Sequence, residues 1–247
     1  MFEGFENRLA VVTGASSGIG LATVDRLLAS GARVLAMSRT MGELDSLQSR
    51  YGDTLKWVKG DVTQSGDLVA LSEQARQMGS VDFLVPNAGI AELANGLEVS
   101  AFERQWAVNG AGALNTLSIL REQLGKSAAV VFIGTFLSQV TFPGLAAYIA
   151  SKTALKAHAR TLAVELAPDG IRINIVSPGP TATAIWSSLG LPQAQLSAVA
   201  ERVNQRLLPG RFLEPAAIAD AIMFLLSPAS RGIYGQDLIV DNGYTLQ

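Results

Sequence analysis

The sequence predicts a single α/β domain in which a doubly wound, mainly parallel sheet of roughly seven strands is covered by helices on both faces. Short apolar runs alternate with helical patterns along most of the chain. The runs are continuously apolar, as in Ala128 to Ile133, which is typical of strands buried between two helical layers. No linker interrupts the 247 residues, so we expect one domain over residues 1–247.

The expected strands are separated by helical patterns with right-handed crossovers and lie near Leu9, Val34, Leu55, Phe83, Val130, Ile173 and Ile239. Sheets of this kind bind ligands at the carboxyl ends of the strands, where the strand order reverses. The segments that directly follow the strands should therefore meet at one site. They contain a glycine turn, Asp61, Asn87, Thr135 and Pro178.

The glycine turn, Thr13 to Gly20, follows the first apolar run directly and leads into a helical pattern. Glycines let the backbone approach a diphosphate, and the free N–H groups and positive dipole end of the following helix then meet its charge. The spacing here is G-x-x-x-G-x-G, which differs from the G-x-G-x-x-G dinucleotide fingerprint. A strand-to-helix turn of this kind can also bind nothing, so by itself it leaves both interpretations open.

Tyr148 and Lys152 are four residues apart in an alanine-rich stretch that is predicted to be helical, so both side chains project from one face. An ammonium close to a phenol stabilises the phenolate and lowers the pKa of the phenol toward neutrality. The pair is therefore a candidate for proton transfer. The alternative is a packed tyrosine and a lysine whose charged end reaches solvent on an amphipathic helix.

Taken together, these motifs resemble the short-chain dehydrogenase/reductase family, whose fold is Rossmann-like, and the resemblance covers essentially the whole chain. It is carried by the glycine turn, Asp61-Val62, Asn87-Ala88-Gly89, Asn109, the Tyr148/Lys152 pair and Pro178-Gly179 with Thr183. The resemblance implies a nicotinamide-dependent oxidoreductase that interconverts a ketone and a secondary alcohol. It also implies a cofactor site formed by Gly14, Ser16, Ser17, Gly18, Ile19, Gly20, Ser38, Arg39, Asp61, Val62, Asn87, Ala88, Gly89, Tyr148, Lys152, Pro178, Gly179, Thr181 and Thr183.

The resemblance assigns a catalytic role to each of four residues. Tyr148 would donate the proton to the carbonyl oxygen, Lys152 would lower the pKa of Tyr148 and hold the nicotinamide ribose, and Asn109 would position a water. Relatives usually carry a serine thirteen positions before the tyrosine, and here that position is Thr135. Ser138, three residues later, is the competing hydroxyl. We favour Thr135 on spacing, since threonine supplies the same hydroxyl.

The end of the second strand predicts which cofactor is bound. An acidic residue there would accept hydrogen bonds from the adenosine ribose and repel a 2′-phosphate, but position 38 is serine. Arg39 then supplies a planar, permanent charge that suits phosphate. We therefore expect NADP(H) to be preferred, with NAD(H) as the alternative cofactor. The competing interpretation is that Arg39 is solvated or stacks on the adenine.

The substrate end of the site is marked less clearly. An insertion-like stretch over 181–209 resembles the mobile substrate-covering loop of the family. We expect an apolar substrate cavity there. Its expected lining is Trp186 of this stretch together with Phe136, Leu137 and Phe142. The same residues could equally pack a surface helix.

Composition restricts the partners. Charged residues make up 16% of the chain and the net charge is −2, so neither a nucleic acid nor a membrane surface is an expected partner. The chain has no cysteine and a single histidine, His158, so we expect no disulfide and no metal site. The uncharged stretch 127–151 is interrupted by glycine, proline and hydroxyl residues, which argues against a membrane span. With no signal peptide at its N-terminus, the chain is expected to be cytoplasmic.

Assembly is implied by the resemblance. Relatives pair two helices between subunits, and the corresponding stretches here are rich in small residues: Ala107, Gly110, Gly112, Ala113, Ala154 and Ala157. A homo-oligomer is expected, and a tetramer with two-fold axes is favoured over a dimer. Two rival functions remain. One is a cofactor-binding sensor or structural subunit with reduced catalysis, and the other is a Rossmann-like methyltransferase, which would have no use for Tyr148 and Lys152.

Overall fold

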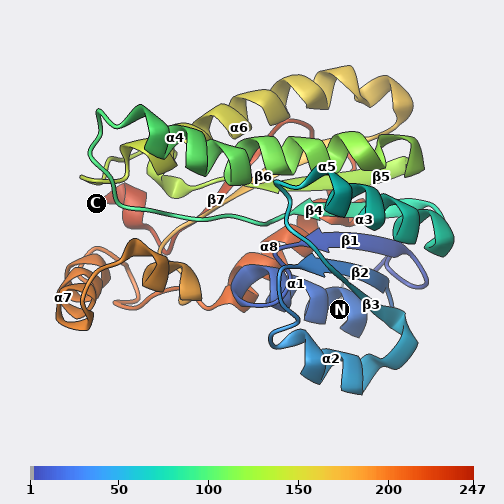
Figure 1. Ribbon diagram of the computed structural model, residues 1–247, viewed down its shortest axis with the longest axis horizontal. Helices are drawn as coiled ribbons and strands as arrows, with labels where there is room; N and C mark the ends of the chain where they lie inside the picture. The colour runs from blue at the N-terminus through green and yellow to red at the C-terminus, as the bar shows by residue number, and fades with distance from the viewer. Residues whose placement is uncertain (1–2) are drawn as a thin grey trace.

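The computed structural model describes residues 3–247 and contains one sheet of seven parallel strands in the order β3-β2-β1-β4-β5-β6-β7 (Figure 1). The order reverses between β1 and β4, which is the doubly wound arrangement expected from the sequence. All seven predicted strand positions are confirmed. The strands are β1 (Leu9–Thr13), β2 (Arg33–Ser38), β3 (Leu55–Lys59), β4 (Val81–Pro86), β5 (Leu124–Ile133), β6 (Arg172–Pro178) and β7 (Asp237–Val240).

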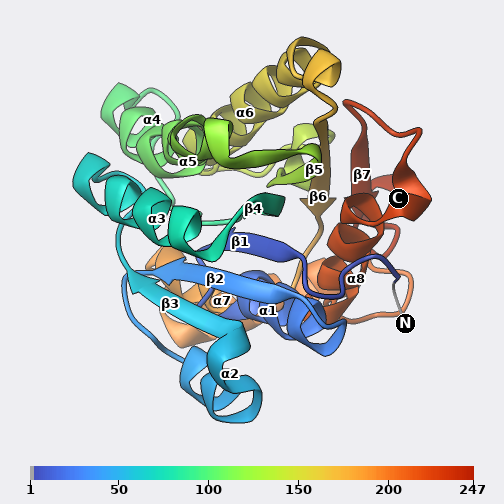
Figure 2. The ribbon, with the colours of Figure 1, turned by 90° about the vertical axis from the view of Figure 1, so that its right-hand side faces the viewer.

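Helices cover both faces of the sheet (Figure 2). One face packs against α1 (Gly18–Ala29), α2 (Leu44–Tyr51) and α8 (Pro215–Leu226). The other packs against α3 (Ser65–Met78), α5 (Ala113–Leu120) and α6 (Ala146–Glu165), with α4 (Val99–Trp106) lying on α6. Short 3-10 helices occupy Gly52–Thr54, Arg121–Gln123, Phe136–Ser138, Ala167–Asp169, Ala184–Leu189, Pro228–Ser230 and Tyr244–Leu246.

The continuous apolar character of the strands follows from this layering. Ala10 and Val12 of β1 belong to the core under α1 and α8, whereas Leu9 and Val11 belong to the core under α3, α5 and α6. Successive side chains of a strand point to opposite faces, so a strand that is buried on both faces is mostly apolar at consecutive positions.

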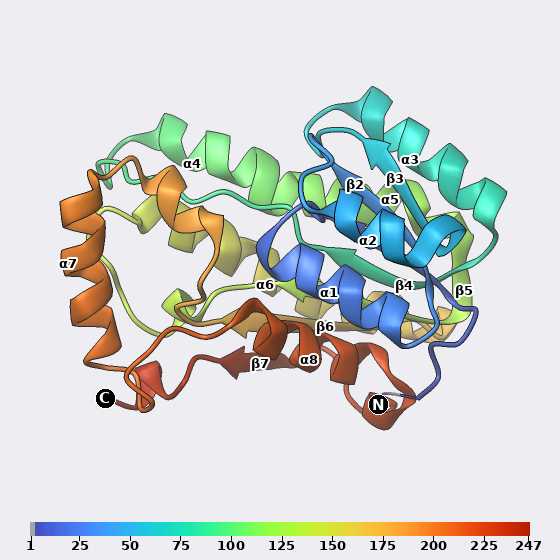
Figure 3. The ribbon, with the colours of Figure 1, turned by 90° about the horizontal axis from the view of Figure 1, so that it is seen from below.

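The stretch 181–209 is mainly helical. It contains the 3-10 helix Ala184–Leu189 and α7 (Gln193–Asn204), which lies at one end of the molecule (Figure 3). A third apolar cluster lies beneath it and includes Phe136, Leu137, Val203 and Tyr244. Within residues 3–247, no helix is both long enough and apolar enough to span a membrane.

The stretch that joins α4 to α5 is a π-helix, Ala107–Gly112, and two of the small residues in it are required by contacts inside the chain. A Cβ on Gly110 would lie 2.0 Å from the Trp106 ring, and one on Gly112 would lie 2.6 Å from the Val62 side chain. Their small size therefore serves intrachain packing and is no evidence for a subunit contact.

Candidate functional site

A cavity of about 710 Å³ runs along the carboxyl ends of the strands and receives nearly every predicted site residue. The residues that border it are Gly14, Ser16 to Ile19, Ser38, Arg39, Asp61, Val62, Asn87-Ala88-Gly89, Thr135, Tyr148, Lys152, Pro178 to Thr181 and Thr183. Gly20 and Asn109 do not. These two residues are buried behind the wall of the cavity.

The glycine turn is held against the end of β4. The Asn87 amide donates to the carbonyls of Thr13 and Gly14, both at 3.0 Å. A Cβ on Gly14 would lie 2.6 Å from Cα of Ala88, and one on Gly20 would lie 2.2 Å from the Gly14 carbonyl oxygen. The absence of a side chain at these positions thus lets the turn close onto β4, and Gly20 acts by packing.

The N-terminus of α1 is open toward the cavity. Its N-cap residue, Ser17, makes no side-chain capping hydrogen bond, and its first turn contains no acidic residue. The free N–H groups and the positive dipole end of the helix therefore suit an anion. This arrangement fits the diphosphate of a dinucleotide.

Next to this turn, the Ser38 hydroxyl is hydrogen-bonded within the chain, whereas the Arg39 side chain is exposed. The Ser38 hydroxyl donates to the Thr40 carbonyl at 2.8 Å and accepts from Trp57 Nε1 at 2.9 Å, so it is already engaged within the chain. Arg39 is exposed and borders the cavity. The guanidinium of Arg39 is thus the group at this end that is suited to an added phosphate.

Lys152 is buried, with 4% of its surface exposed. Its Nζ donates to the Ile133 carbonyl at 2.9 Å, and burial lowers the pKa of Lys152 to about 8. A Cβ on Gly89 would lie 3.4 Å from this Nζ, so the glycine leaves room for it.

The pKa of Tyr148 is shifted in the direction opposite to the one expected from the sequence. Burial raises the pKa of the Tyr148 phenol above its usual value, and the nearby Thr135 hydroxyl partly opposes that rise. The expected lowering of this pKa by Lys152 is wrong for this structure, because loss of solvation dominates and the ammonium is directed to the Ile133 carbonyl. The phenol is therefore a protonated donor at neutral pH.

Thr135 and Ser138 have different surroundings. Thr135 borders the cavity, and its Oγ1 accepts from the Leu137 N–H at 3.3 Å, which leaves the hydroxyl proton free to point elsewhere. Ser138 does not border the cavity, and its Oγ accepts from Lys156 Nζ at 3.4 Å. The geometry supports Thr135 as the hydroxyl beside Tyr148.

Asn109 lies in the π-helix, a form that is frequent at functional sites. Its Nδ2 donates to the Ile90 carbonyl at 2.9 Å and to Ser151 Oγ at 3.0 Å, and its Oδ1 accepts from the Ile90 N–H at 2.8 Å. Both amide hydrogens are therefore in use. The side chain positions the segment at Ile90. The expected positioning of a water by Asn109 stays a prediction.

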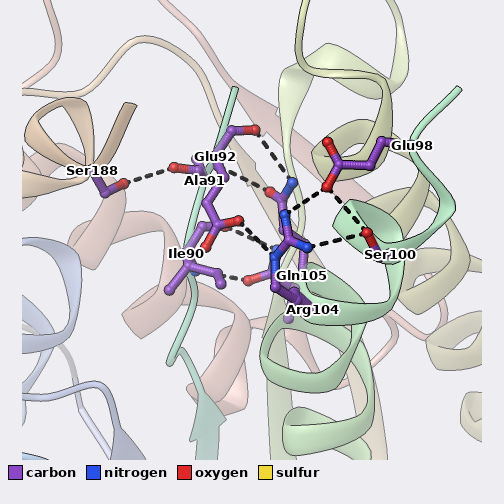
Figure 4. A network of polar contacts seen from close by, with 9 residues as sticks. Ile90, Ala91, Glu92, Glu98, Ser100, Arg104, Gln105 and Ser188 are labelled. Atoms are coloured by element: carbon purple, nitrogen blue, oxygen red, sulfur yellow. Dashed lines mark hydrogen bonds and ion pairs between the residues drawn. The ribbon is translucent and has the colours of Figure 1, made fainter. Parts of the chain in front are cut away.

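Gln105, which sequence reasoning missed, repeats this contact one helical turn earlier (Figure 4). It accepts from the Glu92 N–H at 3.1 Å and donates to the Glu92 carbonyl at 3.2 Å. Between the two clamped residues, the Ala91 carbonyl accepts from Ser188 Oγ at 2.8 Å. The signal in the sequence was a second amide four residues before Asn109 on the same helical face.

The substrate end of the cavity is bordered by the four predicted side chains, Phe136, Leu137, Phe142 and Trp186. Of the described residues that border the cavity, only Arg39, Asp61 and Lys152 are charged, and all three belong to the predicted cofactor or catalytic set. Nor do residues 3–247 contain a cluster of side chains that could hold a metal ion.

Tyr244 also borders the cavity and was missed. Its ring meets that of Phe136 edge-on, with centroids 5.0 Å apart, and the Arg206 guanidinium lies 4.2 Å from its centroid. The Asp241 carboxylate accepts from the N–H groups of Gly243 and Thr245, which shapes the turn that carries this ring. No local sequence pattern predicts the contact between Tyr244 and Phe136, because the two residues lie far apart in the chain.

Known proteins resemble this chain over nearly its whole length. A family model described as "Enoyl-(Acyl carrier protein) reductase" matches residues 14–245. Carbonyl reductase [NADPH] 2 from Sus scrofa is 33% identical over 245 residues, which cover 97% of each chain. L-xylulose reductase from Homo sapiens is 36% identical over 242 residues, which cover 96% of each chain.

Solved structures agree in fold. A short-chain dehydrogenase/reductase from Brucella melitensis superposes with a TM-score of 0.89 at 29% identity and covers 98% of each chain. L-sorbose reductase from Gluconobacter frateurii, complexed with NADPH and L-sorbose, gives a TM-score of 0.90 at 25% identity and covers 100% of each chain.

Proposed function

Because the chain belongs to the short-chain dehydrogenase/reductase family, we propose that it is an NADP(H)-dependent oxidoreductase that interconverts a ketone and a secondary alcohol. The observation that carries this proposal is the meeting of Tyr148, Lys152 and Thr135 in the cavity onto which the glycine turn opens. Relatives named as NADPH-linked carbonyl and sugar reductases support the same reaction class.

The chain's own residues fit the cofactor. The glycine turn and the open N-terminus of α1 would hold the diphosphate, Arg39 the 2′-phosphate, and Lys152 the nicotinamide ribose. When bound, the nicotinamide supplies or accepts the hydride.

Tyr148 supplies the proton in this proposal. Its raised pKa keeps the phenol protonated at neutral pH, so it can donate to the carbonyl oxygen during reduction. The Thr135 hydroxyl polarises the same oxygen. In the oxidative direction Tyr148 must first lose its proton, and that step is favoured at alkaline pH.

A neutral, apolar substrate suits the cavity best. The aromatic and aliphatic lining at the substrate end offers no ion to pair with a charged substrate. An ionised group that was buried there without a partner would be strongly disfavoured. The segment over 181–209 covers this end and would exclude water.

The chain is also proposed to act in the cytoplasm as a homo-oligomer, either a tetramer or a dimer. Exposed apolar side chains at Val99 of α4 and Val164 of α6, with 69% and 75% of their surfaces accessible, support an interface on these helices. Light scattering at micromolar concentration would test this, and a monomer mass would contradict it.

A panel of neutral ketones, assayed for NADPH oxidation and for exchange of labelled hydride, tests the reaction class. Turnover with uncharged aryl or cyclic ketones, and weak or no turnover with carboxylated analogues, is expected. The threonine at position 135 is the one feature that favours a sensor or structural subunit with reduced catalysis. Tight NADPH binding without hydride exchange across the panel would favour that alternative.

A further inference from the structure

Lys156 and Asp237 form an ion pair next to the turn that carries Thr135. Lys156 Nζ lies 2.6 Å from Asp237 Oδ2, and the side chains are only 19% and 11% exposed. Within residues 3–247, this is the most buried of the ion pairs. Removing two charges from water opposes much of their attraction, so such a pair contributes little to stability by itself. Its presence calls for another explanation.

The pair contacts two serines. The Ser177 hydroxyl donates to Asp237 Oδ1 at 2.5 Å, and Lys156 Nζ donates to Ser138 Oγ at 3.4 Å. The four side chains come from β6, β7, α6 and the turn after β5. The network thus joins the last two strands of the sheet to the helix that carries Tyr148.

Both serines lie next to the segment that presents Thr135. Ser138 closes the turn that Thr135 begins, because its N–H donates to the Thr135 carbonyl at 3.2 Å. On the other side, a Cβ on Gly134 would lie 2.5 Å from Ser177 Oγ, so Ser177 abuts the residue before Thr135. The network therefore touches the chain immediately before and after the Thr135 turn.

The helix α6 completes the connection. Tyr148, Lys152 and Lys156 follow one another at four-residue intervals, so they lie along one face of the helix. We propose that Lys156 and Asp237 are positioning residues that fix the Thr135 turn against α6. The hydroxyls of Thr135 and Tyr148 then point toward the same substrate oxygen. This inference rests on the proposed function.

The test replaces the ion pair with apolar side chains, Lys156→Met together with Asp237→Leu. Such replacements are often neutral or stabilising, so the fold should survive. The double variant loses the contacts to Ser138 and Ser177. Lys156→Arg keeps the charge and serves as the conservative variant. The matched control is Arg8→Met with Asp82→Leu, which removes a 2.7 Å ion pair at the amino-terminal ends of the central strands β1 and β4.

Three measurements are made on each protein: kcat with a ketone substrate, the dissociation constant for NADPH by fluorescence, and amide hydrogen exchange in a peptide that covers residues 134–138. In the double variant we expect kcat to fall roughly tenfold to a hundredfold, since a displacement of about 1 Å is known to have effects of this size. NADPH affinity should change less than twofold, and exchange in 134–138 should become faster. Lys156→Arg and the control should stay within twofold of wild type in kcat.

A double variant with kcat within twofold of wild type, or with unchanged exchange in 134–138, would overturn the proposal. So would an equal fall of kcat in the control. Failure of the proposed function looks different, because the wild-type protein would then reduce no ketone at all. The exchange comparison would still decide whether the ion pair orders this segment.

Discussion

Asn109 binds both backbone groups of Ile90, accepting from its N–H at 2.8 Å and donating to its carbonyl at 2.9 Å. Gln105 does the same for Glu92. Two amides one helical turn apart thus clamp alternate residues of an extended segment, as a neighbouring strand would. The segment borders the cavity at Ile90 and Ala91, so the clamp fixes one wall of the site.

Replacing Asn109 with leucine should therefore affect both stability and activity. The N–H and carbonyl of Ile90, whose bonds to Asn109 are partly buried, would lose their partners, and each such loss costs about 1–3 kcal/mol where water cannot replace the partner. We expect the free energy of unfolding to fall by roughly 2–4 kcal/mol in urea titrations, with a lower kcat/KM. Asn115→Leu, on the exposed side of the same helical stretch, is the control. Equal stability of the two variants would contradict the clamp.

The lowered pKa of Lys152 should make the free energy of unfolding rise with pH in the alkaline range. Its pKa is about 8 in the folded chain, against 10.5 for an unperturbed lysine. Between these values the unfolded chain binds a proton that the folded chain does not, so stability rises with pH in this window. The cost of the buried charge is present in full below pH 8.

Lys152→Met removes that cost at every pH. From pH 8 to pH 10.5, the free energy of unfolding of the wild type should gain about 3 kcal/mol relative to this variant. Lys56→Met, at an exposed position, should run parallel to the wild type in the same urea titrations. A difference between wild type and Lys152→Met that does not change with pH would show that the pKa of Lys152 is not lowered.

Much of the fold was predictable because the strands are buried on both faces. Runs such as Val34 to Met37 have no polar position, and that property is visible in the sequence alone. The exact bounds were not. β5 begins at Leu124, before its apolar core, since backbone pairing extends a strand beyond its buried part. The π-helix at residues 107–112 has no sequence signature that could have predicted it.

The site was predictable where residues follow strands, and not where remote segments meet. Asn87 and Thr135 were found from their place after apolar runs. Tyr244 depends on a turn after β7 that folds back toward Phe136, and no periodic pattern encodes this contact. The pKa of Tyr148 was predicted in the wrong direction, because spacing reveals a neighbouring charge but not the extent of burial.

Arg39 should decide between the two nicotinamide cofactors. Hydrogen bonds to a charged group contribute about 1.5–3 kcal/mol, which corresponds to tenfold or more in affinity. Arg39→Met should therefore raise KM for NADPH at least tenfold and leave KM for NADH within about twofold. Arg231→Met, at an exposed position, is the control. Equal changes with both cofactors would show that Arg39 does not read the 2′-phosphate.

Tyr244 should limit the size of the substrate. Its ring packs on Phe136 and beneath Arg206, so truncation opens the wall of the cavity at this point. Tyr244→Ala should raise the ratio of kcat/KM for bulky against small ketones by roughly tenfold, as expected for a change in the shape of an apolar pocket. Tyr234→Ala, where the tyrosine is 41% exposed, should leave the ratio unchanged. An unchanged ratio in Tyr244→Ala would remove Tyr244 from the substrate site.

The pH dependence of the reaction should reflect the raised pKa of Tyr148. Reduction requires the protonated phenol, so its rate should hold through neutral pH and fall only at alkaline pH. Oxidation requires the phenolate, so its rate should rise toward alkaline pH.

The most direct measurement of the central claim is the turnover of Tyr148→Phe, which removes the proposed proton donor and keeps the ring. General acid catalysis typically contributes about 10²–10⁴-fold, so kcat for ketone reduction should fall at least a hundredfold. NADPH affinity and thermal stability should remain close to those of wild type, and Tyr234→Phe should keep full activity. A Tyr148→Phe enzyme with kcat within a few fold of wild type would contradict the assignment of Tyr148 as the proton donor.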